Sequence, residues 1–221
     1  MGSILHRGTL LTWYQRLLAA FGPQGWWPGE TPFEIALGAI LTQNTNWRNV
    51  AKVIAALKSE GLLDPAGLGA MPEAELARRL KSAGYYNLKA RRVKNFLAFF
   101  AARFNNSMAA MAAAPWPQLR RELLAVPGIG PETADSILLY ALQQPTFVVD
   151  AYTFRILNRH GLAPEPCSYE DLRAFFMERL PPEVPLYQEY HALLVRLGKE
   201  FCRPRPRCEG CPLESGPGAE T

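Results

Sequence analysis

A glycine-containing turn and one aspartate downstream of it are the residues of this sequence best suited to chemistry. The turn, Val126–Gly130 (VPGIG), joins two segments with helical periodicity. Its two glycines permit backbone conformations in which successive amide N–H groups point outward, and such amides bind a phosphate oxygen. Pro131 then begins the second helix, whose positive end adds to the same anion site. The segment therefore predicts a phosphate-binding hairpin, with Ile129 filling the space between its two helices.

The aspartate is Asp150, which follows the short, extended-looking run Thr146–Val149. A carboxylate can stabilise positive charge that develops on a sugar as a glycosidic bond breaks, and it can orient or deprotonate a water molecule. It can also accept hydrogen bonds from the first turn of a helix, as the N-cap of a helix that begins at Ala151. The two roles are compatible, and the residues alone leave both open.

Residues Leu123–Arg155 resemble the helix-hairpin-helix segment of the endonuclease III superfamily of DNA glycosylases, in which an aspartate follows the hairpin at this spacing. Matches to the same superfamily extend across nearly the whole chain: LTQNT (41–45), GYYNLKA (84–90), HALLVRLGK (191–199) and CRPRPRCEGCPL (202–213). The resemblance implies that Gly128, Ile129 and Gly130 bind DNA and that Asp150 is catalytic at the mouth of a base pocket. The partner would be double-stranded DNA with one damaged base rotated out of the helix.

Gln43, within LTQNT, matches the glutamine that fills the gap left by the extruded nucleotide in this superfamily. An uncharged amide suits that task because it both donates and accepts hydrogen bonds and can therefore bond the exposed bases of either strand. The alternative is that Gln43 caps the C-terminus of its own helix.

Glu132 separates this chain from the bifunctional members of the superfamily. In those enzymes the residue two positions after the second glycine of the hairpin is a lysine, which attacks the sugar and forms a Schiff base. A carboxylate cannot form that imine, so the resemblance predicts a monofunctional glycosylase that leaves an abasic site intact. Glu132 is either a solvent-facing residue of the first helical turn, stabilised by the helix dipole, or part of the wall of the base pocket.

The tryptophans predict the substrate. Gly25–Pro28 (GWWP) and Leu41–Trp47, together with GPETADSILLY, resemble the 3-methyladenine glycosylase branch of the superfamily. By that likeness Trp26 or Trp27, with Pro28 and Trp47, would sandwich the flipped base. An N3-methylated adenine nucleotide is cationic, and an aromatic face attracts a cation by roughly 0.5–2 kcal/mol. The alternative for each tryptophan is ordinary core packing.

Three cysteines, Cys202, Cys208 and Cys211, are spaced C-x5-C-x2-C near the end of the sequence, and such clustering favours a metal site over disulfides. The motif resembles the loop of endonuclease III that holds a [4Fe–4S] cluster with four thiolates. The fourth cysteine is missing, because residues 215–217 read Ser-Gly-Pro at its place. A non-cysteine fourth ligand, a labile cluster, no cluster, and zinc are the alternatives left open.

Composition predicts a globular protein in the cytoplasm. Hydrophobic residues make up 48% of the 221 residues, without a run of membrane-spanning length, and MGSILHRG is too short and polar to be a signal. The net charge is +4, and the run Arg78–Lys94 carries seven basic residues without an acid. Such a run is either a solvated helix face or a nucleic-acid contact. Nothing in the sequence indicates an oligomer, so we expect a monomer.

Helical periodicity and frequent helix punctuation predict an all-α fold. The expected helices are 9–21, 31–43, 47–60, 65–70, 72–83, 87–104, 116–125, 131–143, 151–160, 168–180 and 186–199. The Ala-rich stretch Met108–Ala114 reads as a connector. The resemblance implies one lobe over 31–143, with the hairpin at about 118–143, and a second lobe over 1–30 plus 144–201. DNA would bind in a cleft between the lobes; the cysteine loop (202–213) and a disordered tail (214–221) would follow.

The sequence thus predicts a monofunctional DNA glycosylase of base-excision repair that acts on alkylated purines such as 3-methyladenine. One alternative is a glycosylase for uracil, hypoxanthine or mismatched adenine. The other is a non-catalytic helix-hairpin-helix protein that only binds DNA.

Glu132 generates the first testable prediction. Borohydride added during turnover should trap no covalent adduct between protein and DNA, since a carboxylate stands where the amine would form the imine. Abasic sites should accumulate uncut until alkali is added. Comparison at single-turnover rates separates this result from slow nicking by other amines. An adduct that forms as fast as the base is released would contradict the monofunctional assignment and point to another lysine, such as Lys199.

Overall fold

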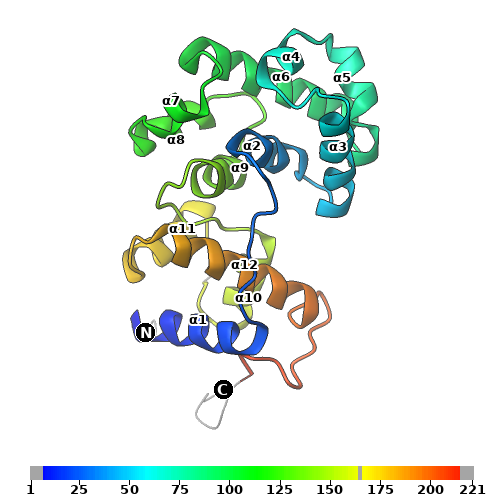
Figure 1. Ribbon diagram of the computed structural model, residues 1–221. Helices are drawn as coiled ribbons and strands as arrows, with labels where there is room; N and C mark the ends of the chain where they lie inside the picture. The colour runs from blue at the N-terminus through cyan, green and yellow to red at the C-terminus, as the bar shows by residue number, and fades with distance from the viewer. Residues whose placement is uncertain (1–6, 164–165, 215–221) are drawn as a thin grey trace. The chain divides into compact units, whose positions relative to one another are not determined.

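The computed structural model describes residues 7–163 and 166–214, and over these residues the chain is built of helices without a β-strand (Figure 1). The predicted all-α fold is confirmed. The beginning of the MGSILHRG segment, the tail from residue 215 onward and the Ser-Gly-Pro at 215–217 lie outside the described residues.

The chain forms two compact units. The continuous unit comprises Trp27–Gln144, and the split unit comprises Met1–Trp26 together with Pro145–Thr221. The structure therefore divides the chain between the two adjacent tryptophans and again just before the extended run that leads to Asp150.

The continuous unit holds the hairpin and a large apolar core. Its elements are α2 (Pro32–Leu41), α3 (Trp47–Ser59), α4 (Pro65–Ala70), α5 (Glu73–Arg79), the 3-10 turn η1 (Lys81–Ala83), α6 (Tyr86–Phe104), α7 (Met108–Ala112), α8 (Trp116–Leu124), α9 (Pro131–Ser136) and the π-helical turn η2 (Ile137–Ala141). Side chains of α2, α6 and η2 are fully buried at its centre, among them Leu37, Phe96 and Leu138. Caps match sequence signals: Asp64, for example, accepts from the Gly67 amide at the start of α4.

The Ala-rich stretch is a correction to the sequence analysis. Residues 108–114 were expected to be a connector, but Met108–Ala112 form the short helix α7. Alanine has the highest helix propensity, and Ser107 caps the helix by accepting from the Ala110 amide at 3.1 Å. Met111 anchors this turn in the core with no exposed surface.

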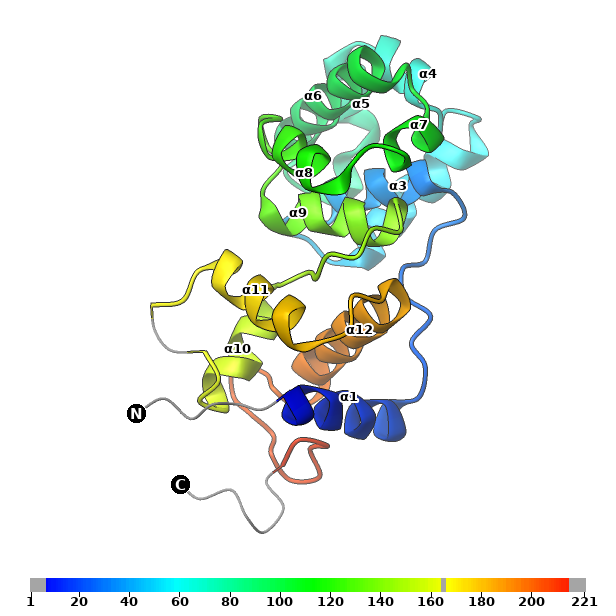
Figure 2. The same ribbon diagram turned by 90° about the vertical axis from the view of Figure 1, so that its left-hand side faces the viewer.

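The split unit contains α1 (Arg7–Phe21), α10 (Ala151–Arg159), α11 (Tyr169–Arg179) and α12 (Val184–Glu200), as Figure 2 shows from a second side. Its core is aromatic. Phe147, on the extended run before α10, stacks on Phe176 with ring centroids 4.0 Å apart, and the edges of Tyr187 and Tyr190 meet the Phe147 ring. The buried Phe147 therefore anchors the run that carries Asp150.

Within the split unit, α12 lies unusually close to α10 at Gly198. A Cβ atom at Gly198 would stand 2.8 Å from both Cβ and Cγ of Tyr152 and closer still to its Cδ1. Only a residue without a side chain permits that approach. Gly198 thus sets how α12 packs on the helix that begins at Asp150.

No helix of residues 7–163 and 166–214 is long and apolar enough to cross a membrane.

Gly198→Ala should destabilise the protein by about 1–3 kcal/mol, since the added methyl overlaps the stem of Tyr152 and the two helices must shift apart. The measurement is chemical denaturation monitored by circular dichroism. Gly69→Ala is the matched control: Gly69 also lies in a helix, but a Cβ atom there would meet nothing within 4 Å, so this change should be neutral or stabilising by up to about 1 kcal/mol. Equal stability of both variants would show that the approach of α10 and α12 does not depend on Gly198.

Candidate active site

Asp150 is the N-cap residue of α10, and its carboxylate is fixed by that helix. Its Oδ1 accepts two hydrogen bonds from Thr153, one from the backbone amide at 2.8 Å and one from the hydroxyl at 2.9 Å. Thr153 is itself fully buried. The capping role that the sequence allowed is therefore present, and it leaves Oδ2 outside the Thr153 contacts.

The other carboxylate oxygen faces a histidine from α12. Nε2 of His191 lies 3.7 Å from Oδ2 of Asp150, and both side chains are almost buried, with 6% and 11% of their surface exposed. Burial by itself would raise the pKa of Asp150. The nearby imidazole of His191, together with the two Thr153 bonds, outweighs burial and holds the pKa of Asp150 below its ordinary value. Asp150 is therefore an ionised, nearly buried carboxylate at neutral pH.

The hairpin in the continuous unit has the backbone that a phosphate site needs. Gly128 adopts a φ of +95°, whereas Gly130 stays in the extended region as the N-cap of α9. The Ile129 amide donates to Val126 O, and the Ile129 side chain is buried in the core as expected. Over the described residues, the amides of Gly128 and Gly130 make no backbone hydrogen bond, and both residues are exposed. Two N–H groups are thus available for an anion at this turn.

Gln43 is tied to this hairpin rather than to its own helix. Its Nε2 donates to Gly128 O at 3.0 Å and to Oγ1 of Thr133 at 2.8 Å, while its Oε1 accepts from Arg92. The C-cap residue of α2 is Thr42, whose hydroxyl donates to Gly38 O. Thr42 is therefore the C-terminal cap of α2, the role considered for Gln43 as an alternative. The amide of Gln43 instead connects the end of α2 to the hairpin.

Two further contacts stiffen the hairpin. A Cβ at Gly128 would collide with the aliphatic stem of Arg92, so the Arg92 side chain lies directly against the turn. Arg120 of α8 and Asp135 of α9 form two parallel hydrogen bonds of 2.8 and 2.9 Å, with Asp135 fully buried. Such bidentate pairs fix geometry as well as charge, which keeps the two helices of the hairpin in register.

The predicted base-binding residues divide between the units. Trp27 and Trp47 are both in the continuous unit, where their rings meet edge-on with centroids 5.5 Å apart. Trp27 also contacts Tyr140, and both tryptophans pack against the core. Two rings in edge contact leave no slot between them, so the structure does not bring Trp27 and Trp47 together as the two faces of a sandwich. Pro28 is exposed.

Trp26 belongs to the split unit, where Nζ of Lys199 lies 5.6 Å from the centroid of its ring. Glu132 is exposed on the first turn of α9, in the continuous unit. Its solvent-facing position agrees with one of the two roles considered from the sequence, and its contact with a base stays a prediction.

The basic run is less uniform than its sequence suggests. Lys89 is buried and donates to Ala83 O at 2.6 Å; burial and the neighbouring Arg92 lower its pKa to about 8. Lys94 donates to two backbone carbonyls, and Arg79 pairs with two glutamates. The exposed cations are Arg78, Lys81 and Arg91, the last 3.6 Å from a carboxylate oxygen of Glu73. Only some of the basic side chains in this run therefore face solvent.

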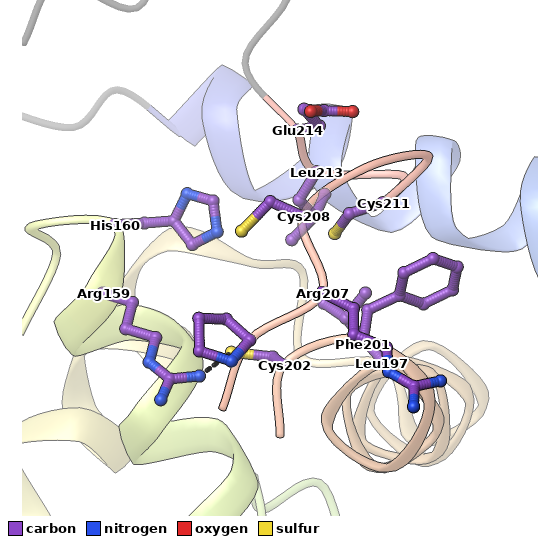
Figure 3. A pocket seen from close by; sticks show the side chains of 11 residues that line it. Arg159, His160, Leu197, Phe201, Cys202, Arg207, Cys208, Cys211, Leu213 and Glu214 are labelled. Atoms are coloured by element: carbon purple, nitrogen blue, oxygen red, sulfur yellow. Dashed lines mark hydrogen bonds between the residues drawn. The ribbon is translucent and has the colours of Figure 1, made fainter. Parts of the chain in front are cut away.

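The three clustered cysteines line one cavity of about 250 Å³ in the split unit, drawn in Figure 3. Arg155 and Arg159 of α10 hold the loop: Arg155 donates to Cys202 O at 2.7 Å, and Arg159 donates to the Cys202 sulfur at 3.3 Å. No group of three His, Cys, Asp or Glu side chains among residues 7–163 and 166–214 is close enough to hold a single metal ion.

Comparison with known proteins decides the family. A family model described as HhH-GPD superfamily base excision DNA repair protein matches residues 37–182. The chain belongs to the HhH-GPD superfamily. A protein of Methanocaldococcus jannaschii, provisionally named a DNA repair glycosylase (MJ1434), is 45% identical over 91% of this chain and 92% of its own length. Endonuclease III of Thermotoga maritima is 28% identical over 83% and 81% of the two chains.

Solved structures agree with this HhH-GPD assignment. A structure of H. pylori 3-methyladenine DNA glycosylase (MagIII) bound to 1,N6-ethenoadenine is similar with a TM-score of 0.76, at 27% identity over 88% of this chain and 97% of the other. An endonuclease III–DNA complex shares the fold with a TM-score of 0.80 over 95% and 94% of the chains, at 24% identity. The broad class predicted from the sequence, a DNA glycosylase of this superfamily, is confirmed.

Sequence reasoning about this HhH-GPD protein missed the neighbours of its candidate residues. Thr153 and His191 both lie within stretches that resemble the superfamily, but the resemblance singles out neither of them as a partner of Asp150. The i, i+3 spacing of Asp150 and Thr153 was the available signal for a capping bond. No local pattern connects Asp150 with His191, which lies 41 residues later on another helix.

His191→Gln should raise the pKa of Asp150, because burial is then opposed less strongly. Carboxyl ¹³C NMR titration measures this directly. The signal of Asp171, whose pKa is lowered by its own bonds to Ser168, should not move and is the internal control. The ionised Asp150 stabilises the fold above its unfolded pKa and loses that effect as the pH falls through its lower folded pKa, so the variant should lose less stability on acidification. Unchanged titration of Asp150 would show that His191 does not set its charge.

Proposed function

We propose that this HhH-GPD protein is a monofunctional DNA glycosylase that hydrolyses the N-glycosidic bond of alkylated purines, with 3-methyladenine as the type substrate. The observation that carries this proposal is the ionised, nearly buried carboxylate of Asp150 at the position where the superfamily has its aspartate. The binding of double-stranded DNA by the hairpin is part of the same proposal.

The role of Asp150 follows from its environment. Breaking the glycosidic bond leaves positive charge on the sugar, and a fixed carboxylate in a region of low dielectric stabilises that charge strongly. A lowered pKa makes Asp150 a weak proton acceptor. We therefore assign it electrostatic stabilisation and the orientation of water, with Oδ2 as the working oxygen because Oδ1 already accepts both Thr153 bonds.

A cationic base suits this chemistry. An N3-methylated adenine nucleotide already carries the charge that protonation would otherwise supply, so its base leaves without a strong general acid. Glu132 would attract the cation, and Trp26, Trp27, Pro28 and Trp47 would contact the base through their ring faces or edges. Support comes from the likeness to MagIII, whose own structure contains 1,N6-ethenoadenine. The absence of a lysine at position 132 is the reason for assigning no lyase step.

Two residues are candidates for filling the gap left by the extruded nucleotide. Gln43 would have to release hydrogen bonds to Gly128, Thr133 and Arg92 before it could reach a base. Tyr85 is 69% exposed and held at a φ of +46°, an uncommon conformation for a bulky residue. An exposed apolar side chain presented on a tight turn resembles the wedges that DNA-bending proteins insert between base steps. We propose that Tyr85 shares this task, while Gln43 holds the hairpin.

We further propose that Cys202, Cys208 and Cys211 hold an iron–sulfur cluster. The cavity between them and the Arg159 bond to the Cys202 sulfur support this, since hydrogen bonds to cluster sulfurs stabilise the thiolate form and tune the cluster.

One incubation tests the enzymatic proposal. Duplex DNA carrying random methylated purines is mixed with excess protein, and the free bases are identified by mass spectrometry. We expect 3-methyladenine to be released, with abasic sites left uncut. Release of uracil or hypoxanthine from matched duplexes, without methylated purines, would instead establish another specificity. Binding of DNA without release of any base would contradict the proposed activity and indicate a non-catalytic DNA-binding protein.

Glu132→Gln should lower the release of cationic methylated purines more than that of a neutral base such as hypoxanthine, since only the cation loses an attraction. The measurement is the ratio of single-turnover rates on the two substrates. Glu178→Gln, at an exposed glutamate of α11, is the matched control and should leave the ratio unchanged. Equal losses on both substrates would place Glu132 outside the base pocket.

A further inference from the structure

The cysteine-lined cavity has a histidine on its wall. His160, the C-cap residue of α10, borders the same space of about 250 Å³ as Cys202, Cys208 and Cys211. In Figure 3 the imidazole of His160 points toward the sulfur of Cys208, and the Cys202 sulfur lies nearby on the bond from Arg159. The sequence contains only three histidines, and one of them therefore stands where the thiols gather.

We propose that His160 is the fourth ligand of a [4Fe–4S] cluster whose other ligands are Cys202, Cys208 and Cys211. A cubane cluster needs one protein ligand for each of four irons, and this chain supplies three clustered thiols. Imidazole replaces thiolate on iron in other iron–sulfur centres, so the substitution is chemically sound. Cys167, the remaining cysteine, does not line the cavity.

The ring and the backbone of His160 are both held in place next to the cavity. Its ring is held edge-on by the buried Trp13 of α1, with centroids 4.8 Å apart. Its backbone amide donates to Ile156 O and Leu157 O, which fixes the residue at the end of α10. Among the interactions found over residues 7–163 and 166–214, none is a hydrogen bond to a ring nitrogen of His160. An imidazole packed against tryptophan, and not engaged elsewhere, can turn a nitrogen toward a metal.

A cluster and a single zinc ion need different arrangements of their thiol ligands. Zinc binds sulfur at about 2.3 Å, so its thiolates must converge to within about 4 Å of one another. A cluster instead places its irons at separate corners, and its ligands surround a cavity, as these three thiols and His160 do.

The basic residues around the cavity fit thiolates. Arg159 donates to the Cys202 sulfur at 3.3 Å, and Arg207 also lines the space. Positive groups and hydrogen-bond donors lower the cost of holding several thiolates together. Replacement of a thiolate by a neutral imidazole lowers the negative charge further and should raise the reduction potential relative to a four-cysteine cluster.

The test uses the full chain purified without oxygen, and it does not depend on glycosylase activity. Iron and acid-labile sulfide should each be present at about four per chain. The protein is then labelled with ¹⁵N-histidine, the cluster is converted to its paramagnetic form, and pulsed electron paramagnetic resonance is recorded. A nitrogen bound directly to the cluster is expected in the wild type.

Three variants assign that nitrogen. His160→Ala should lose the coupling and retain about three irons or fewer. His160→Cys should retain about four irons without the coupling and at a lower reduction potential, which separates ligand loss from misfolding. His191→Gln, the control at the other described histidine, should keep both coupling and iron.

Zinc in place of iron, or neither metal nor sulfide, would overturn the cluster itself. A cluster without nitrogen coupling in the wild type, or with coupling that survives in His160→Ala, would overturn the role of His160. Because every readout is chemical or spectroscopic, failure here leaves the proposed base release untouched, and failure of base release leaves this result standing.

Discussion

The close approach of α12 to α10 at Gly198 is the constraint on which both proposed sites of the split unit depend. The Cβ-free position lets Tyr152 lie against the α12 backbone. His191, seven residues earlier and therefore on about the same face of α12, then reaches the carboxylate of Asp150. Where α12 ends, Cys202 receives bonds from Arg155 and Arg159. One helix, α10, thus begins at the proposed catalytic residue and ends at the proposed cluster ligand.

The chemical character of Asp150 follows from a competition between burial and bonding. A carboxylate with 11% of its side chain exposed would be expected to take up a proton more readily than one in water. Thr153 and His191 reverse that tendency, so the negative charge is retained in a place where water screens it poorly. The same bonding that keeps the charge makes the group a poor base. In the proposed reaction such a carboxylate would suit leaving groups that depart without much help, as methylated purines would.

Local signals allowed much of the fold to be predicted. Asp64 and Ser168 cap their helices as such residues usually do, and Asp150 does so as well, so the helix starts followed from single residues. The prediction that the Ala-rich stretch is a connector was wrong, because an alanine run without proline forms a helix once a serine caps it. The hairpin was predictable since glycine and proline restrict the backbone locally. Even there, only Gly128 uses the positive φ that glycine permits.

What the sequence could not supply were partners brought together by tertiary packing. The contact of Trp27 with Trp47, the bond of Gln43 to the hairpin and the pairing of His191 with Asp150 join residues 20 to 90 positions apart. Charge was misleading for a related reason: Lys89 and Lys94 look like surface cations in the sequence, but both end on backbone carbonyls. A lysine stem is long enough to reach either water or an unsatisfied carbonyl, and only the packed structure decides between them.

The most direct measurement of the central claim is the single-turnover rate of base release by Asp150→Asn on methylated duplex DNA, together with its affinity for the same DNA. The amide keeps the shape of the side chain and removes its charge, so the rate should fall by two to three decades, or about 3–4 kcal/mol, with little change in affinity. Asp171→Asn, at the capping aspartate of α11, is the matched control and should release bases at the wild-type rate. Release by Asp150→Asn at the wild-type rate would contradict a catalytic role and leave Asp150 as a helix cap only.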